Sequence, residues 1–192
     1  TWPLGRRQDR FQTNFGDNRV FWIDPKDPRH MMLGSDGGIY ATWDGGLTMN
    51  HYYHIPLGEV YHVEADMETP YNIYIGLQVH ETWKAPSNGW SGSVTPADWV
   101  ITGMWDGMYS KVDPETNRYI YYTTQFGSHH RVDQATGERV PVTPVAAEGQ
   151  PFYRFTWTTP LALSPHNSSI IYTGAQMVLR SLDRGEHWEE IS

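Results

Sequence analysis

The stretch IDPKDPRHMMLG, residues 23–34, returns three more times in related form along a chain of 192 residues. The other copies are ADMETPYNIYIG at 65–76, VDPETNRYIYYT at 112–123 and LSPHNSSIIYTG at 163–174. The second residues of these phrases, at positions 24, 66, 113 and 164, are 42, 47 and 51 positions apart. A period of about 40 to 50 residues with several strands per unit is typical of β-propeller blades. Each phrase is predicted to be a turn that leads into an inner strand of a blade.

The rest of the sequence also predicts β-structure. Short runs such as RVFWI, EVYHV and RYIYYTT stand between Gly, Pro, Asn and Asp, and no segment shows a helical spacing of apolar residues. We therefore predict an all-β fold: a partial β-propeller of about four blades, each a four-stranded antiparallel sheet. The expected units are roughly 15–59, 60–98, 99–150 and 151–192, within a single sector over 1–192.

The composition excludes some classes of function. The formal net charge is −8 and the longest basic run is GRRQDR at 5–10, which argues against a nucleic-acid partner. No apolar stretch reaches the roughly 18 residues of a transmembrane segment. Cysteine is absent, so disulfides and thiol catalysis are excluded. The chain starts at Thr1 without a signal peptide, and we expect a processed product or a fragment of a longer protein.

A second motif follows the first phrase and the fourth. TWDGGLTM at 42–49 and SLDRGEHW at 181–188 share the pattern Ser/Thr-x-Asp-x-Gly, which VDQATGE at 132–138 echoes loosely and VHETWKAPSNG at 79–89 replaces. Asp accepts backbone N–H bonds in turns, and Gly adopts positive φ at little cost. We expect a structural turn lock, with calcium or ligand contact at the surface as the alternative. Its residues are Thr42, Asp44, Gly46 and Thr48, and Ser181, Asp183, Gly185 and Trp188.

With the pattern Ser/Thr-x-Asp-x-Gly-x-Thr-Trp, the chain resembles proteins that carry the Asp-box, or bacterial neuraminidase repeat. From about Phe15 to Ser192 the order of the units is similar to that of the large bacterial sortilin-like propeller proteins. The resemblance implies a propeller of more than four blades that is usually exported, and hence extracellular or periplasmic. It also implies that the Asp-box lies at the periphery of a blade, between the third and fourth strands.

The chain departs from this family in two loops. It has GLQVHET at 76–82 where relatives carry Gly-Leu-Gln-Asp-Asn-Gly, and TGMWDG at 102–107 where they carry Gly-Gly-Gly-Asp-Gly. Val79 and His80 therefore replace Asp and Asn, and Met104 and Trp105 replace two glycines. Loops that could form a polar axial site become bulkier and more apolar, which favours a surface that packs against a partner.

Two carboxylates are candidates for catalysis. Asp98 and Asp106 lie near the start of the third unit, and the chain also resembles xyloglucan-degrading Asp-box propellers, which use two carboxylates. Inverting hydrolysis needs such a pair about 6.5–9.5 Å apart. The alternative is structural, with Asp106-Gly107 as a turn and Asp98 as a cap. A sialidase is not expected, because Arg131, Arg154 and Arg180 are scattered over different units.

The histidines do not predict a metal site. His51 and His54 are three residues apart, and 129–130 is a His pair that we expect at a hairpin tip. Neither has zinc-ligand spacing, so solvated or half-buried histidines are expected and no metal or cofactor is predicted. A metal site assembled in the tertiary structure is left as an alternative.

Taken together, the sequence predicts a non-catalytic propeller domain that binds or scaffolds a protein partner within a larger exported assembly. Aromatic side chains often anchor protein interfaces. The expected binding surface is formed by the four tryptophans of the second unit and the start of the third, Trp83, Trp90, Trp99 and Trp105. The alternative is an extracellular glycoside hydrolase, or a carbohydrate-binding propeller, that uses Asp98 and Asp106.

Overall fold

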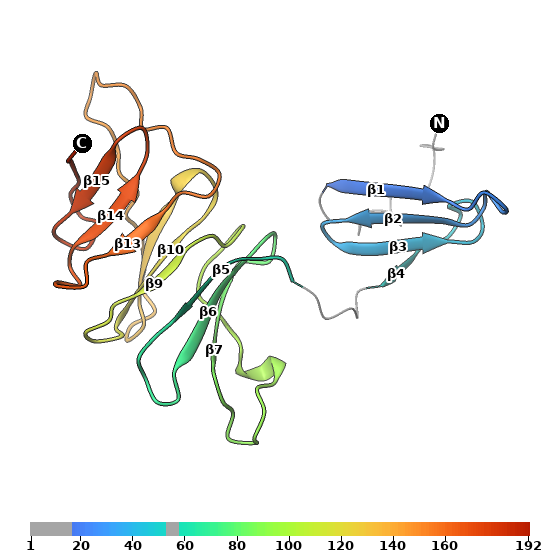
Figure 1. Ribbon diagram of the computed structural model, residues 1–192, viewed down its shortest axis with the longest axis horizontal. Helices are drawn as coiled ribbons and strands as arrows, with labels where there is room; N and C mark the ends of the chain where they lie inside the picture. The colour runs from blue at the N-terminus through green and yellow to red at the C-terminus, as the bar shows by residue number, and fades with distance from the viewer. Residues whose placement is uncertain (1–16, 53–57) are drawn as a thin grey trace. The chain divides into compact units, whose positions relative to one another are not determined.

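The computed structural model describes residues 17–52 and 58–192, and these residues form sixteen strands in four antiparallel sheets (Figure 1). The chain divides into two compact units, residues 1–57 and 58–192. The all-β, blade-repeat architecture predicted from the sequence is confirmed.

The first unit contains one four-stranded sheet in the order β1-β2-β3-β4. Its strands are β1 (Asn18–Ile23), β2 (Met31–Ser35), β3 (Gly38–Thr42) and β4 (Asn50–Tyr52). The turn between β1 and β2 is closed by Asp24, whose backbone N–H donates to the His30 carbonyl and whose carboxylate accepts from the Lys26 N–H at 2.8 Å. The repeated phrase is therefore a turn between the first and second strands of the sheet.

The second unit contains three such sheets, which follow one another along the chain (Figure 1). The first has β5 (Val60–Ala65), β6 (Asn72–Leu77), β7 (Thr82–Pro86) and β8 (Val100–Ile101), with a 3₁₀ turn η1 (Pro96–Asp98) before β8. The second has β9 (Ser110–Val112), β10 (Tyr119–Thr123), β11 (His129–Asp133) and β12 (Arg139–Pro141), with η2 (Gln125–Gly127) between β10 and β11. The third has β13 (Leu161–Leu163), β14 (Ile171–Gly174), β15 (Val178–Ser181) and β16 (Glu189–Glu190). That the whole chain forms a single sector stays a prediction.

The acid of the repeated phrase closes the turn in this unit too. Asp66 is buried and accepts from the Asn72 backbone N–H at 2.8 Å, the Asn72 side-chain amide at 2.7 Å and the Tyr74 hydroxyl at 3.0 Å. Asp113 is also buried and accepts from the Thr116 hydroxyl at 2.7 Å. Buried carboxylates need such partners, because an unpaired buried charge is costly. In the last sheet Ser164 takes the place of the acid, and its hydroxyl accepts from the His166 N–H at 3.2 Å, so the phrase recurs because each of these turns is locked by a side-chain oxygen at the same position.

Apolar side chains fill the space between neighbouring sheets of the second unit. Two clusters of buried residues are found: Tyr74, Val112, Ile120, Tyr122 and Val132 in one, and Tyr121, Leu161 and Ile171 in the other. The first joins β5–β8 to β9–β12 and the second joins β9–β12 to β13–β16. Burial of these faces is the main contribution to the stability of the unit.

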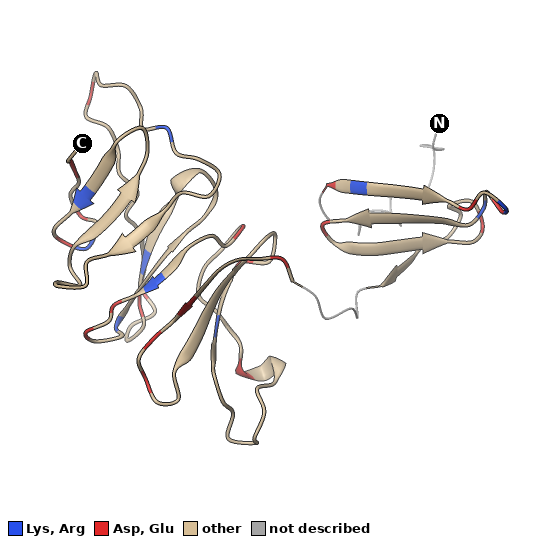
Figure 2. Cartoon of the chain, in the orientation of Figure 1, with Lys and Arg blue, Asp and Glu red and all other residues tan. Residues whose placement is uncertain are grey.

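Charged side chains are spread over turns and strand ends. Figure 2 shows Lys and Arg at separate points of the described ribbon, and three of them, Arg118, Arg131 and Arg184, lie 5.2, 5.6 and 5.3 Å from the centroid of the Tyr119 ring. No helix within the described residues is long and apolar enough to cross a membrane.

Candidate functional site

The first Asp-box lies in the turn between β3 and β4. The Thr42 hydroxyl donates to Asp44 Oδ1 at 2.8 Å and accepts from the Gly46 N–H at 2.9 Å. Asp44 also accepts from the Thr48 N–H at 2.8 Å and the Thr48 hydroxyl at 2.7 Å. These donors lower the pKa of Asp44 to about 2, with the Thr48 backbone N–H the largest cause. The carboxylate is engaged within its own turn.

The second Asp-box repeats this network between β15 and β16. The Ser181 hydroxyl donates to Asp183 at 2.9 Å and accepts from the Gly185 N–H at 2.8 Å. Asp183 accepts from the His187 N–H at 2.9 Å, and its pKa is likewise lowered to about 2. The indole of Trp188 donates to the Val142 carbonyl at 3.0 Å, which ties the turn to the chain after β12.

Asp106 connects three segments that are distant in sequence. It is buried in the linker between β8 and β9, where Oδ1 accepts from the Val79 N–H and Oδ2 accepts from the Gln125 side-chain amide at 2.7 Å. The neighbouring Trp105 carbonyl accepts from the Glu81 N–H at 3.0 Å. The β6–β7 turn, the β8–β9 linker and η2 are thus held together around one carboxylate.

The backbone of these three segments is strained. Val79, Glu81, Trp105 and Phe126 have φ values of 62°, 69°, 61° and 54°, and they are four of the six described non-glycine residues with positive φ. Such a conformation costs about 1–2 kcal/mol per residue and persists where surrounding contacts fix it. It therefore marks loops whose shape is determined by the structure around them.

These loops present exposed aromatic rings. The exposed fractions of Trp105, Phe126 and Trp157 are 69%, 62% and 41%. The Phe126 and Trp157 rings meet edge to face with centroids 5.2 Å apart, and the Trp157 indole donates to the Tyr61 hydroxyl at 3.2 Å. Because Trp105 precedes Asp106 and Phe126 follows Gln125, the hydrogen bond between Asp106 and Gln125 brings their chain segments together. We call Trp105, Phe126 and Trp157 the aromatic platform.

Only Trp105 of the aromatic platform belongs to the binding surface predicted from the sequence. The four predicted tryptophans come from three different segments, and that they form one binding surface stays a prediction. Trp83 is half-buried on β7 and its indole donates to the His80 carbonyl, while Trp90 and Trp99 lie in the β7–β8 loop, at the opposite end of β8 from Trp105. Aligning the loops that follow each repeated phrase would have indicated Phe126, since it occupies the same connection as Val79.

Asp98 is placed apart from Asp106. Its carboxylate caps η1, where Oδ2 accepts from the Thr95 N–H at 2.7 Å and the Thr95 hydroxyl at 2.8 Å. The backbone N–H of Thr95 is the main cause of its lowered pKa. Strand β8 runs between the two acids, so they lie at its opposite ends. Each carboxylate is bound to local donors rather than to a shared site.

The histidine prediction is wrong at one position. His129 begins β11 instead of standing at a hairpin tip, and it is buried, with an exposed fraction of 1%. Its Nδ1 lies against the Gly127 carbonyl and its Nε2 is 2.7 Å from the Thr173 hydroxyl of the next sheet. Burial lowers the pKa of this imidazole to about 4. This histidine is a neutral contact between two sheets.

The other histidines are placed differently. His51 Nε2 is 2.7 Å from the Gly37 carbonyl and its ring stacks on Tyr40, whereas His54 lies outside the described residues. His130 is half-buried and stacks on Tyr122. Among residues 17–52 and 58–192, no three His, Cys, Asp or Glu side chains are grouped as a metal site would require.

Solved structures share the fold at low sequence identity. A GH74 xyloglucanase from Xanthomonas campestris matches with a TM-score of 0.50 and 16% identity, over 91% of this chain and 30% of that one. A GH74 enzyme from Niastella koreensis matches with a TM-score of 0.49 and 17% identity, over 90% of this chain and 29% of that one. YCF48 bound to a D1 peptide matches with a TM-score of 0.48 and 12% identity, over 93% of this chain and 54% of that one. The chain spans less than a third of the two GH74 proteins. The likeness to the Xanthomonas campestris protein shows the β-propeller fold alone.

No protein-family model matches the sequence, and no curated protein matches it either.

Proposed function

We propose that the chain is a non-catalytic β-propeller module of the sortilin-like Asp-box type, which binds a protein partner through the aromatic platform within a larger exported assembly. The observation that carries the proposal is the set of exposed rings on loops fixed by Asp106. Trp105 and Phe126 are more than half exposed although their backbones are strained and hydrogen-bonded. Rigid, exposed aromatic side chains are effective interface anchors, since little conformational entropy is lost when they are buried.

The engagement of the two candidate acids supports a non-catalytic role. Both oxygens of Asp106 accept hydrogen bonds from groups that position loops, and Asp98 caps its own 3₁₀ turn. A general acid or base has to be within hydrogen-bond reach of the substrate proton. Using Asp106 in that way would require breaking the contacts that hold the aromatic platform together.

The surroundings of the aromatic platform favour a protein over a sugar. Met104, exposed by 45%, adds a further apolar side chain next to Trp105. The rings of Phe126 and Trp157 are 85° apart and so do not form one flat stacking surface. Carbohydrate binding is the second candidate, because the indole of Trp105 is exposed by 69% and one such face can stack on a sugar ring.

The test is a comparison of two variants of the affinity-tagged chain in cells of the source organism. The double variant Trp105→Ala/Phe126→Ala removes two aromatic platform rings, and Trp90→Ala removes a fully exposed ring from the β7–β8 loop. We expect the double variant to bind the co-purifying protein at least about tenfold more weakly, since two anchors typically contribute more than 1.4 kcal/mol together. Trp90→Ala should bind as the wild type does.

Retention of the same partner by the double variant would contradict the proposal. Titration with soluble β-glucan oligosaccharides separates the second candidate. Quenching of tryptophan fluorescence that Trp105→Ala removes would establish sugar binding instead. Far-UV circular dichroism of each variant checks that the sheets remain folded.

A further inference from the structure

Glu81 lies against the segment that carries Trp105 of the aromatic platform. Its backbone N–H donates to the Trp105 carbonyl at 3.0 Å, and its carbonyl accepts from the Leu77 N–H at 2.9 Å. A Cβ added to Gly107 would lie 2.3 Å from the Glu81 carbonyl oxygen, so the two segments are closely packed. The half-buried side chain of Glu81 therefore starts from a backbone that is fixed beside Trp105.

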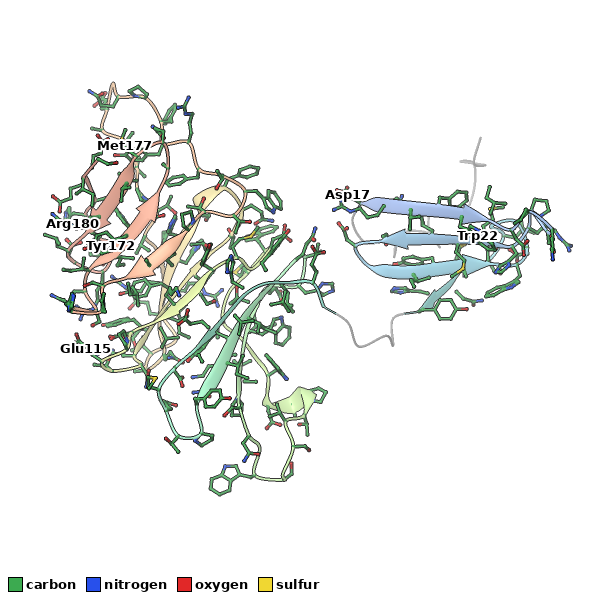
Figure 3. The ribbon with its side chains drawn as sticks, viewed as in Figure 1. Asp17, Trp22, Glu115, Tyr172, Met177 and Arg180 are labelled. Carbon is green, nitrogen blue, oxygen red and sulfur yellow. The ribbon has the colours of Figure 1, made fainter. Side chains whose placement is uncertain are left out.

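The β10–β11 connection shows that the turn itself does not need this acid. The Thr124 N–H donates to the Ser128 carbonyl at 2.9 Å, which is the same closing hydrogen bond as that from Leu77 to Glu81. Serine thus occupies the place of Glu81 one sheet later. The β14–β15 connection, where Figure 3 labels Met177, contains no acid either.

The carboxylate of Glu81 is uncompensated. Within residues 17–52 and 58–192 it has no hydrogen-bond or ion-pair partner. The β6–β7 turn, the β8–β9 linker and η2 contain no Lys or Arg, and their other acid, Asp106, accepts only from uncharged groups. Arg139 of β12 donates to the Thr102 carbonyl at 3.2 Å, at the start of the linker. The aromatic platform is therefore bordered by negative charge.

The aromatic platform lies at junctions between sheets of this chain. Trp105 is in the linker from β8 to β9, Phe126 is in η2, and Trp157 is in the linker from β12 to β13. The sheets on both sides of these linkers are present, and the clusters that include Tyr74 and Tyr121 fill the space between them. A further blade would adjoin β5–β8 or β13–β16 on their outer sides, since each repeat contacts only its neighbours. The surroundings of Trp105 thus do not depend on where the sequence ends.

We propose that the protein bound by the aromatic platform presents a basic side chain, arginine or lysine, which lies over the Trp105 indole and pairs with Glu81. Recognition of this kind rests on the proposed function, because the same surface is involved. A partner that covers Trp105 also takes Glu81 out of water, and a buried carboxylate without a cation is costly. An indole is the aromatic ring that attracts a cation most strongly, so the ring and the carboxylate favour the same group.

Nuclear magnetic resonance of the full chain tests the charge requirement with small probes. N-acetyl-arginine amide should shift the indole N–H signal of Trp105, which is identified by its absence from Trp105→Phe. N-acetyl-citrulline amide is the matched neutral probe, because a urea group replaces the guanidinium, and it should shift that signal much less. No shift with the arginine probe, or equal shifts with both probes, would overturn the proposal.

Glu81→Gln removes the charge and keeps the size of the side chain. It should raise the dissociation constant of the arginine probe at least about threefold and weaken binding of the co-purifying protein by a similar factor, as expected for one partly exposed ion pair. Glu138→Gln removes the same charge from the exposed β11–β12 turn and should bind as the wild type does. Unchanged affinity in Glu81→Gln would also overturn the proposal.

The basic side chain and the aromatic platform can be rejected separately. Loss of the co-purifying protein by Trp105→Ala/Phe126→Ala but not by Glu81→Gln would keep the aromatic platform as the binding surface and reject the basic side chain. Retention of that protein by the double variant would reject both.

Discussion

Replacing Gly76 with alanine is expected to lower the free energy of unfolding of the second unit by about 3 kcal/mol or more. A Cβ at this position would lie 2.2 Å from the Met108 carbonyl oxygen and 2.4 Å from the Gly107 carbonyl oxygen. These are backbone atoms of the linker that leads into the next sheet, so no side-chain rotation can relieve the overlap. The two sheets would have to separate, and part of the contact around Tyr74 would be lost.

Gly174 provides a matched control, because it occupies the same position of the repeat in β14. A Cβ there would meet only Pro160 Cγ at 3.3 Å. We expect Gly174→Ala to change the free energy of unfolding by less than about 1 kcal/mol, since among the described residues the added Cβ meets one side-chain atom and no backbone atom. Urea unfolding followed by tryptophan fluorescence measures both variants. Equal losses of unfolding free energy in Gly76→Ala and Gly174→Ala would contradict the packing described for β5–β8 and β9–β12.

The contrast between Gly76 and Gly174 shows which features of the fold can be predicted from the sequence and which cannot. The blade repeat was predictable because its turn lock is local: Asp66 and Asp113 bind donors within the next few residues, and this leaves a fixed spacing. The close approach of Gly76 to residue 107 depends on how one sheet meets the next. No local pattern distinguishes Gly76 from Gly174, so that contact could not be read from the sequence.

Acidification from pH 6.5 to pH 4 is expected to lower the free energy of unfolding of the second unit by about 3 kcal/mol, because His129 is protonated more readily in the unfolded chain. In the unfolded chain this imidazole takes up a proton near pH 6.5, whereas in the folded chain it does so only near pH 4, because burial disfavours the charged form. Between these values the unfolded state binds more protons. The stabilising contribution is therefore complete above about pH 6.5 and is lost as the pH falls through about 4.

His129→Gln isolates this effect, because glutamine does not titrate. The pH dependence of its unfolding free energy should be flatter than that of the wild type between pH 6.5 and 4, measured by urea titration at fixed ionic strength. Burial also lowers the pKa of His62 and His130. Their contributions remain in both proteins and cancel in the difference. Parallel curves for the two proteins would contradict the neutral, buried state of His129.

The candidate site was less predictable than the fold. Trp105 was identified because it departs from the pattern of the resembling family, and Asp106 because it lies near the start of the third unit, but their roles depend on contacts across the sequence. Gln125 reaches Asp106 from 19 positions away, and Phe126 is aimed outward by a positive φ that a phenylalanine seldom adopts. The resemblance to xyloglucan-degrading propellers also suggested that Asp98 and Asp106 could act as a pair, whereas strand β8 separates them.

The most direct test of the central claim, that Asp106 holds a binding surface and performs no chemistry, is the release of reducing sugar from β-glucans by the full chain, with Asp106→Asn as the comparison. The account predicts no release above the blank by the wild type. It also predicts a lower unfolding temperature for Asp106→Asn, because an amide cannot accept from both the Val79 N–H and the Gln125 amide. Release of sugar by the wild type that Asp106→Asn abolishes, with the unfolding temperature unchanged, would contradict it.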